Sequence, residues 1–79
     1  MTIDVYTKPA CQPCRATKRK LDQLGVEYNE HQAADHMDML SPLGHTSAPV
    51  VVVTNDAGDM VTHWAGFVPD KLKGLTREQ

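Results

Sequence analysis

The chain has little of several features that other protein classes depend on. Its 79 residues include two cysteines, one tryptophan and one phenylalanine, and the longest strongly apolar run is the four valines at 50–53. Such a run is far shorter than the roughly 20 apolar residues that span a bilayer, and the first residues show no basic leader followed by an apolar segment. Neither sign of charge dominates, because 8 basic and 10 acidic residues leave a net charge of −2. We therefore expect a cytoplasmic protein whose partners are neither membranes nor nucleic acids.

The short length also limits the architecture. A chain of this size buries roughly 60% of the surface that its unfolded form exposes, so its core is small. We expect a single domain over residues 1–79, present as a monomer. Any chemistry should occur in a shallow surface site, because a small core leaves little room for a deep cavity.

The hydrophobic pattern alternates between two periods along the chain. Apolar residues recur at every second position in some segments, which is typical of strands, and every three to four positions in others, which is typical of helices. These patterns predict strands at 2–6, 26–31, 49–55 and 60–64, and helices at 12–24, 33–40 and 69–75. The order β-α-β-α-β-β-α predicts an α/β fold, in which a four-stranded mixed sheet is flanked by three helices.

Glycine and proline mark where these elements end. Gly25 should close the first helix as a C-terminal cap. Pro42 and Gly44 should end or distort the second helix, because proline cannot continue the helical hydrogen-bond pattern. The segment 55–59, NDAGD, has the composition of a turn, and the last four residues, TREQ, are expected to fray.

The two cysteines, Cys11 and Cys14, are separated by two residues. In a reducing compartment a close pair is seldom a structural disulfide, which leaves a redox dithiol, half of a metal site or two inert buried side chains. A helix that begins at Gln12 places Cys11 at its N-cap and Cys14 one turn inside. Free backbone N–H groups and the positive end of the helix dipole stabilise an anion there. We therefore expect the pKa of the Cys11 thiol to lie below its usual value of about 8.5, and Cys14 to be more shielded.

The residues around the pair favour a reactive dithiol. Lys8 and Arg15 are basic neighbours of Cys11 and should support a thiolate, whereas Lys18 and Lys20 have the character of a solvated face. Pro13 lacks an N–H that the first helical turn would leave unpaired, and it stiffens the turn that spaces the sulfurs.

The chemistry that follows is thiol–disulfide exchange. The Cys11 thiolate attacks a disulfide of a partner protein and forms a mixed disulfide. Cys14 then attacks the Cys11 sulfur, which releases the reduced partner and leaves the pair oxidised. A further reductant must restore the dithiol, and no metal or organic cofactor is required.

A zinc-binding interaction module is the alternative from another class. The cysteine pair is followed by His31 and His36, which is close to the spacing of a zinc site with two cysteines and two histidines. In such a site, however, the cysteines lie on a hairpin and the histidines on a helix. Here Cys11 opens a helix and His31 ends a strand, so we expect the two histidines to face different directions. We expect no metal, and we expect all four histidines to be exposed or loosely packed.

Three segments together resemble a known family. "VYTKPACQPC", "LGHTSAPVVVV" and "HWAGFVPDKL" resemble the glutaredoxin branch of the thioredoxin superfamily, and within it the NrdH-redoxins. The resemblance implies a thioredoxin/glutaredoxin-like fold and a small electron donor to class Ib ribonucleotide reductase that thioredoxin reductase reduces. It implies Cys11 as the attacking thiol, Cys14 as the resolving thiol and Pro49 as a cis-proline. The backbone of Ala48 would then lie open beside the dithiol and could pair with an extended partner segment.

The resemblance also assigns a binding rim. Trp64, Gly66 and Phe67 would lie on it, with the aromatics exposed as a docking patch; the alternative for Trp64 is a core tryptophan that ends a strand. Glutathione-dependent glutaredoxins, the alternative within the class, usually carry G-G-x-S/T/D-D where this chain has "AGFVPD". Val68 and Pro69 occupy positions that need polar groups, so we expect poor glutathione binding. The chain departs from the family pattern at the Gln12–Pro13 pair, at Pro42 and at His45.

Overall fold

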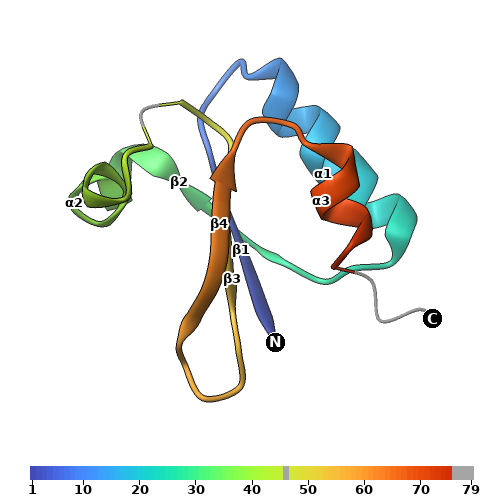
Figure 1. Ribbon diagram of the computed structural model, residues 1–79. Helices are drawn as coiled ribbons and strands as arrows, with labels where there is room; N and C mark the ends of the chain where they lie inside the picture. Colours follow the sequence, from blue (N-terminus) through green and yellow to red (C-terminus); the bar gives the residue numbers. More distant parts are fainter. Residues whose placement is uncertain (46, 76–79) are drawn as a thin grey trace.

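One mixed sheet organises the protein. The computed structural model describes residues 1–45 and 47–75, and its strands lie in the order β2-β1-β3-β4 (Figure 1). β1 pairs in parallel with β2 and antiparallel with β3, and β3 pairs antiparallel with β4. The predicted four-stranded mixed sheet is thereby confirmed; its strands are β1 (Thr2–Thr7), β2 (Asn29–Gln32), β3 (Val50–Thr54) and β4 (Met60–Ala65).

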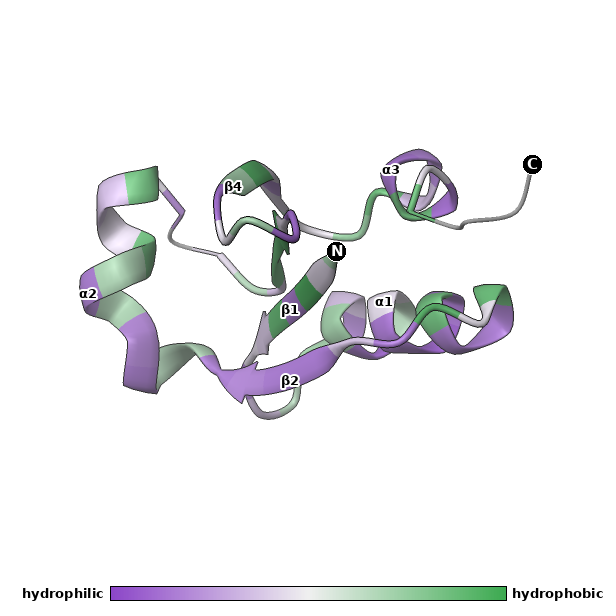
Figure 2. Ribbon diagram, turned by 90° about the horizontal axis from the view of Figure 1, so that it is seen from below, coloured by the Kyte–Doolittle hydropathy of each residue, from purple (hydrophilic) through white to green (hydrophobic). Residues whose placement is uncertain are grey.

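Helical segments cover both faces of the sheet and make three layers. α1 (Gln12–Leu24) and α3 (Pro69–Lys73) lie on one face, and α2 (Met37–Leu40) lies on the other (Figures 1 and 2). Two 3₁₀ turns flank α2, Ala33–His36 before it and Ser41–Leu43 after it. The predicted second helix is thus divided into short turns. Pro42 lies in the last of them and, because it lacks an N–H, does not continue the hydrogen bonds of α2. Within the described part of the chain, no helix has the length and apolar character to cross a membrane.

The core is divided by the sheet into two clusters of buried side chains. The larger lies under α1 and α3 and contains Ile3, Val5, Leu21, Val51, Val53, Trp64, Leu72 and Leu75. The smaller lies under the α2 layer and contains Tyr6, Leu40, Val50 and Val52. Alternation along β1 predicts Tyr6 on the polar side of the strand, yet its side chain is 6% exposed. The reason is that β1 is a central strand, so both of its faces are covered.

The start of β2 differs from the sequence prediction. β2 begins at Asn29 rather than at residue 26, because the Val26 N–H still donates to the Leu21 carbonyl in the closing turn of α1. Gly25 caps this helix at φ 71°, as predicted, in a conformation that glycine adopts without steric cost. The turn at 55–59 is also confirmed, since Asn55 Oδ1 accepts from the N–H groups of Ala57 and Asp59. The fraying predicted for residues 76–79 lies outside the described residues.

Candidate active site

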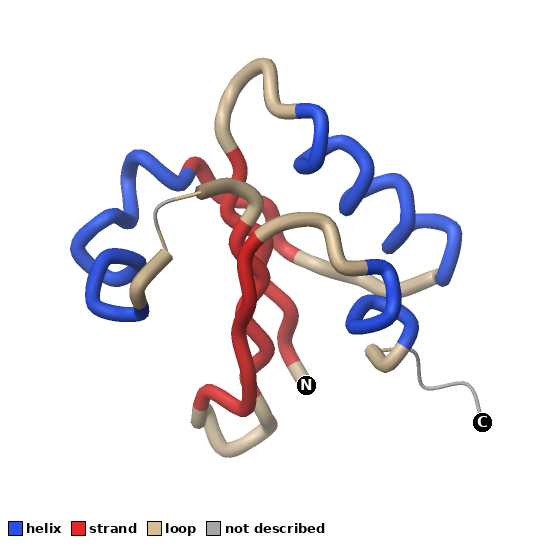
Figure 3. Tube along the Cα trace, turned by 45° about the horizontal axis from the view of Figure 1, so that its top comes forward, coloured by secondary structure: helices blue, strands red, loops and turns tan. Residues whose placement is uncertain are grey.

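Three loops meet at one end of the sheet (Figure 3), and the loop before α1 ends at Cys11. These loops precede α1, precede β3 and follow β4. Two contacts join them: Cys11 Sγ lies 3.8 Å from the Ala48 carbonyl oxygen, and the Gly66 N–H donates to the Pro49 carbonyl at 2.8 Å. The turn between β3 and β4 lies at the opposite end of the sheet (Figure 1).

Cys11 is the N-cap of α1, as the sequence predicts. Its backbone is extended, and its sulfur accepts from the Cys14 N–H at 3.1 Å. Ala10, directly before it, has φ 55°, a left-handed conformation that turns the chain from the β1 strand into the helix. No acidic residue occupies the first turn of α1. The N–H bond and the helix dipole therefore both favour negative charge on the Cys11 sulfur once the pair is reduced.

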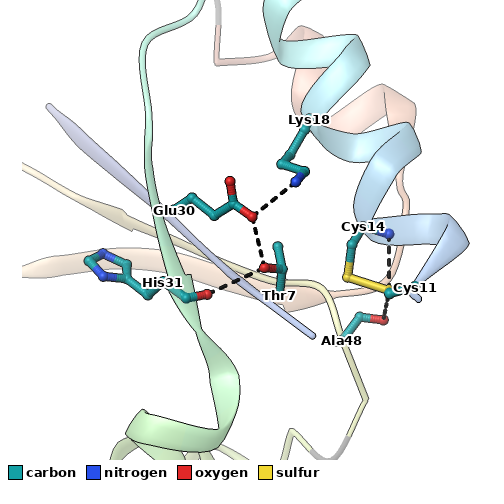
Figure 4. Close-up of a disulfide and its surroundings, with 7 residues drawn as sticks. All are labelled: Thr7, Cys11, Cys14, Lys18, Glu30, His31 and Ala48. Atoms are coloured by element: carbon teal, nitrogen blue, oxygen red, sulfur yellow. Dashed lines mark hydrogen bonds and ion pairs between the residues drawn. A yellow bond between two sulfur atoms is a disulfide. The ribbon is translucent and has the colours of Figure 1, made fainter. Parts of the chain in front are cut away.

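The two sulfurs form a disulfide, with the Cα atoms of Cys11 and Cys14 5.2 Å apart (Figure 4). Both side chains are buried, with Cys11 5% and Cys14 2% exposed. These exposed fractions agree with the prediction that Cys14 is the more shielded of the two. The structure thus describes the oxidised state of a Cys-x-x-Cys pair.

The loop before β3 lies against this disulfide. The Ala48–Pro49 peptide bond is cis, as the family resemblance implies. Pro49 is fully buried, whereas Ala48 is partly exposed. The Ala48 carbonyl is the oxygen near Cys11 Sγ, at a distance that a thiol S–H donor can bridge in the reduced form.

The aromatic rim differs from the expectation. Trp64 is 7% exposed and belongs to the larger core cluster, so it is not an exposed docking residue. Its place in β4 explains this. Side chains alternate between the two faces of a strand, and Trp64 lies on the face that packs under α1 and α3, whereas Ala65 packs against the smaller cluster on the other face. Lys71 on α3 lies over its ring, 5.6 Å from the centroid. Phe67, 40% exposed, is the aromatic side chain that reaches solvent here, and Gly66 has φ 88°.

The three supporting residues named from the sequence lie around the helix start. Lys8 is exposed in the loop that follows β1, and Pro13 and Arg15 are exposed on the first turn of α1. The Arg15 N–H donates to the Cys11 carbonyl at 3.2 Å, which is the first hydrogen bond of the helix.

A polar network beside the disulfide has no counterpart in the sequence-based prediction. Glu30 Oε2 on β2 accepts from Lys18 Nζ at 2.9 Å and from Thr7 Oγ1 at 3.0 Å (Figure 4). Its pKa is lowered, mainly by the hydrogen bond from Lys18 and also by the one from Thr7. The parallel register, in which Val5 pairs with Glu30, directs Glu30 toward α1. The alternation of side chains along β2 would predict that Glu30 faces α1, but only once the register between β1 and β2 is known.

The histidines form two groups on the other face of the sheet. His31 and His36 lie with ring centroids 5.3 Å apart, and both rings contact Tyr6. The expectation that they face different directions was therefore wrong. β2 directs His31 to the α2 side, away from α1 and its cysteines, and its ring bonds to Asp4 instead. No group of three or more His, Cys, Asp or Glu in residues 1–45 and 47–75 is arranged to hold a metal ion.

His45 and His63 form the second group. Their ring nitrogens, Nε2 and Nδ1 respectively, lie 2.7 Å apart. Burial lowers the pKa of His45, and the neighbouring His63 lowers it further. The pair joins the segment before the cis-proline loop to β4.

Comparison with known proteins agrees with this geometry. The glutaredoxin family profile matches residues 3–57. A glutaredoxin-like protein NrdH from Salmonella typhimurium is 37% identical over an alignment of 78 residues that covers 95% of this chain and 89% of that protein. The chain belongs to the glutaredoxin family, in its NrdH-redoxin branch.

Solved and prophage relatives of this NrdH-redoxin support the same assignment. The structure of the NrdH-redoxin from Escherichia coli superposes with a TM-score of 0.83 at 28% identity, covering 100% of both chains. The prophage-derived thioredoxin-like protein YosR of Bacillus subtilis is 25% identical, and the alignment covers 99% of this chain and 98% of YosR. The NrdH-redoxin described here is therefore a thioredoxin-fold disulfide oxidoreductase, and Cys11 and Cys14 lie at disulfide distance in its Cys-x-x-Cys segment.

Proposed function

We propose that this NrdH-redoxin reduces the disulfide of a class Ib ribonucleotide reductase, or of a similar protein, and is itself reduced by thioredoxin reductase. It would act in the cytoplasm as a monomer whose single domain spans residues 1–79. The family assignment supports an electron-donor role in general. The choice of a protein reductant over glutathione rests on the geometry after β4, and the choice of acceptor rests on the resemblance to the NrdH-redoxins.

The segment from Ala65 to Asp70 is the observation that carries the proposal. The Gly66 N–H is already used by the Pro49 carbonyl, at 2.8 Å. Val68 is the N-cap of α3 and supplies no side-chain hydrogen bond, and Pro69 follows with no N–H. A glutathione γ-glutamyl group needs backbone donors and polar side chains at these positions. Their loss disfavours glutathione and favours a protein reductant.

The relatives' descriptions point the same way. The E. coli NrdH-redoxin is described as a glutaredoxin-like protein with a thioredoxin-like activity profile. We extend this profile to the present protein, which is 28% identical over the whole of both chains.

In the proposed cycle Cys11 is the nucleophile and Cys14 resolves the intermediate. The Cys11 thiolate attacks one sulfur of the partner disulfide, and the other partner sulfur leaves as a thiolate and takes up a proton. Cys14, after losing its proton, attacks Cys11 Sγ, and the first partner sulfur leaves in the same way. Two electrons have then passed to the partner, and the disulfide seen here has formed.

The partner would dock along the loop before β3. The partly exposed Ala48 presents backbone next to Cys11 Sγ, while the Pro49 carbonyl is occupied by Gly66. An extended partner segment could therefore pair with Ala48 in the manner of an added strand. Phe67 would supply an apolar contact at the rim, and Lys8 and Arg15 would stabilise the thiolate and Pro13 the turn between the sulfurs. Trp64 would support the rim from the core.

The test is to compare the two reductants directly. Oxidised protein is mixed either with NADPH and thioredoxin reductase or with NADPH, glutathione and glutathione reductase, and NADPH consumption is followed. We expect faster reduction by thioredoxin reductase. A faster glutathione system would assign the protein to the glutathione-dependent glutaredoxins. Turnover of a class Ib ribonucleotide reductase supplied with the reduced protein then tests the acceptor.

A further inference from the structure

Thr17 is a buried polar residue to which the exchange reaction gives no role. Its side chain is 0% exposed, and its hydroxyl has no hydrogen-bond partner. Among the described residues, the only other buried side-chain polar atom without a partner is Trp64 Nε1. Buried hydroxyls nearly always have a partner, so an unpaired one next to a redox centre calls for an explanation.

The position of Thr17 on α1 directs it toward the resolving cysteine. Cys14, Thr17 and Leu21 are the buried residues of this helix and form its inward face. Residues three apart on a helix are neighbours. Helical side chains also lean toward the N-terminal end, so the Thr17 side chain covers the turn that contains Cys14. Only 2% of Cys14 is exposed, so water does not compete freely for its sulfur.

The oxidised state leaves the hydroxyl without a partner. While Cys14 Sγ is bonded to Cys11 Sγ, it makes no hydrogen bond with the Thr17 hydroxyl. Reduction breaks the S–S bond, so the Cys14 side chain becomes free to rotate about its Cα–Cβ bond on the inward face of α1. The sulfur also becomes a thiol, which can both donate and accept, or a thiolate, which is a strong acceptor. Reduction therefore allows a hydrogen bond that the disulfide does not make.

We propose that Thr17 is a positioning residue for the resolving thiol. In the reduced protein its hydroxyl hydrogen-bonds Cys14 Sγ, which stabilises the dithiol state relative to the disulfide and raises the reduction potential of the pair. The bond also holds the sulfur on the inward side of α1 until a mixed disulfide forms on Cys11. Thr17 would thus help to set how strongly the protein donates electrons.

The test measures the redox equilibrium with dithiothreitol. This dithiol gives two electrons and two protons to the Cys11–Cys14 disulfide and itself closes to a cyclic disulfide. Thr17→Val removes the hydroxyl but keeps the shape, and Thr17→Ser keeps the hydroxyl but removes the methyl group. We expect Thr17→Val to shift the equilibrium toward the protein disulfide by about two- to tenfold. A tenfold shift corresponds to about 30 mV. Thr17→Ser should remain close to wild type.

Stability in the two redox states provides the second readout. Urea unfolding of Thr17→Val should show an oxidised form at least as stable as wild type and a reduced form that is less stable. The fold-change that Thr17→Val causes in the unfolding constant of the reduced form, divided by the fold-change for the oxidised form, should equal the fold-change in the redox equilibrium. Thr62→Val, a partly buried threonine on β4, is the matched control and should leave the redox equilibrium unchanged.

Two results would overturn the inference. One is a redox equilibrium that is the same for Thr17→Val and wild type. The other is an equal loss of stability in both redox states, which would mean that the hydroxyl serves the helix rather than the thiol. The inference depends only on exchange at Cys11 and Cys14 and not on the proposed partners. A failure of thioredoxin reductase or ribonucleotide reductase to react would therefore leave it standing.

Discussion

A negative charge placed on residue 12 should destabilise the Cys11 thiolate and stabilise the α1 helix, and a positive charge should do the reverse. Gln12 is the first residue of α1 and is exposed, directly after the N-cap cysteine. A charge on its side chain lies on the order of 7 Å from the sulfur, where Coulomb's law in water gives about 0.6 kcal/mol. At 1.36 kcal/mol per unit, this is about 0.4 pKa units. Gln12→Glu should therefore raise the pKa of Cys11, and Gln12→Lys should lower it, so that the variants differ by about 0.8.

The same substitutions should also alter the stability of the helix, in the direction opposite to their effect on the thiolate. An acid in the first turn stabilises a helix by about 0.3–1 kcal/mol, and a base destabilises it by a similar amount. Gln12→Glu should thus be the more stable variant and the one with the higher Cys11 pKa. The pKa is read from the pH dependence of thiolate absorbance and of iodoacetamide alkylation, at low ionic strength, and stability from urea unfolding. The difference in pKa should shrink at about 0.15 M salt, where the Debye length is about 8 Å. Equal pKa values at low salt, or a lower Cys11 pKa in Gln12→Glu than in Gln12→Lys, would refute the helix-start argument.

Three other substitutions test separate parts of the structure. Leu72→Ala, at a fully buried position of α3, should cost about 2–5 kcal/mol of unfolding free energy in urea, and Val61→Ala, 59% exposed, less than about 0.5; similar losses for the two would contradict the assigned core. Glu30→Gln should remove a stabilisation of less than about 1 kcal/mol, because this carboxyl is 42% exposed. Since the folded pKa is lowered, that stabilisation should be complete above the ordinary pKa of 4.5 and disappear as the pH falls through the folded pKa; a difference that grew in acid would contradict the network. Phe67→Ala should raise the KM for the protein reductant at least about fivefold at unchanged stability, whereas Met60→Ala, at the opposite end of the sheet, should not; equal effects would remove Phe67 from the docking rim.

The sequence predicted what depends on neighbours along the chain. The start of α1 at Gln12, the Cys11 N-cap and the Gly25 C-cap follow from local rules of helix termination, and the structure confirms them. The break near Pro42 follows from its missing N–H in the same way. The mixed sheet follows from the order of the elements, because a helix between strands allows a parallel pair and a short turn requires an antiparallel one.

The sequence could not give what depends on packing between distant elements. Tyr6 and Trp64 are buried because both faces of the sheet are covered, which no alternation within one strand reveals. His31 approaches His36 because the chain turns directly from β2 into a 3₁₀ segment. Glu30 reaches Lys18 through the register of β1 and β2. Each of these contacts joins segments whose relative placement the local pattern leaves open.

Trapping of the mixed disulfide tests the central claim most directly, that Cys11 attacks and Cys14 resolves. Cys11→Ser and Cys14→Ser are each mixed, in reduced form, with a disulfide-containing protein such as insulin, and covalent adducts are quantified by mass spectrometry. The account predicts that Cys14→Ser accumulates an adduct through Cys11 and that Cys11→Ser forms little or none. An adduct that forms mainly in Cys11→Ser, or full disulfide reduction by both variants, would contradict it.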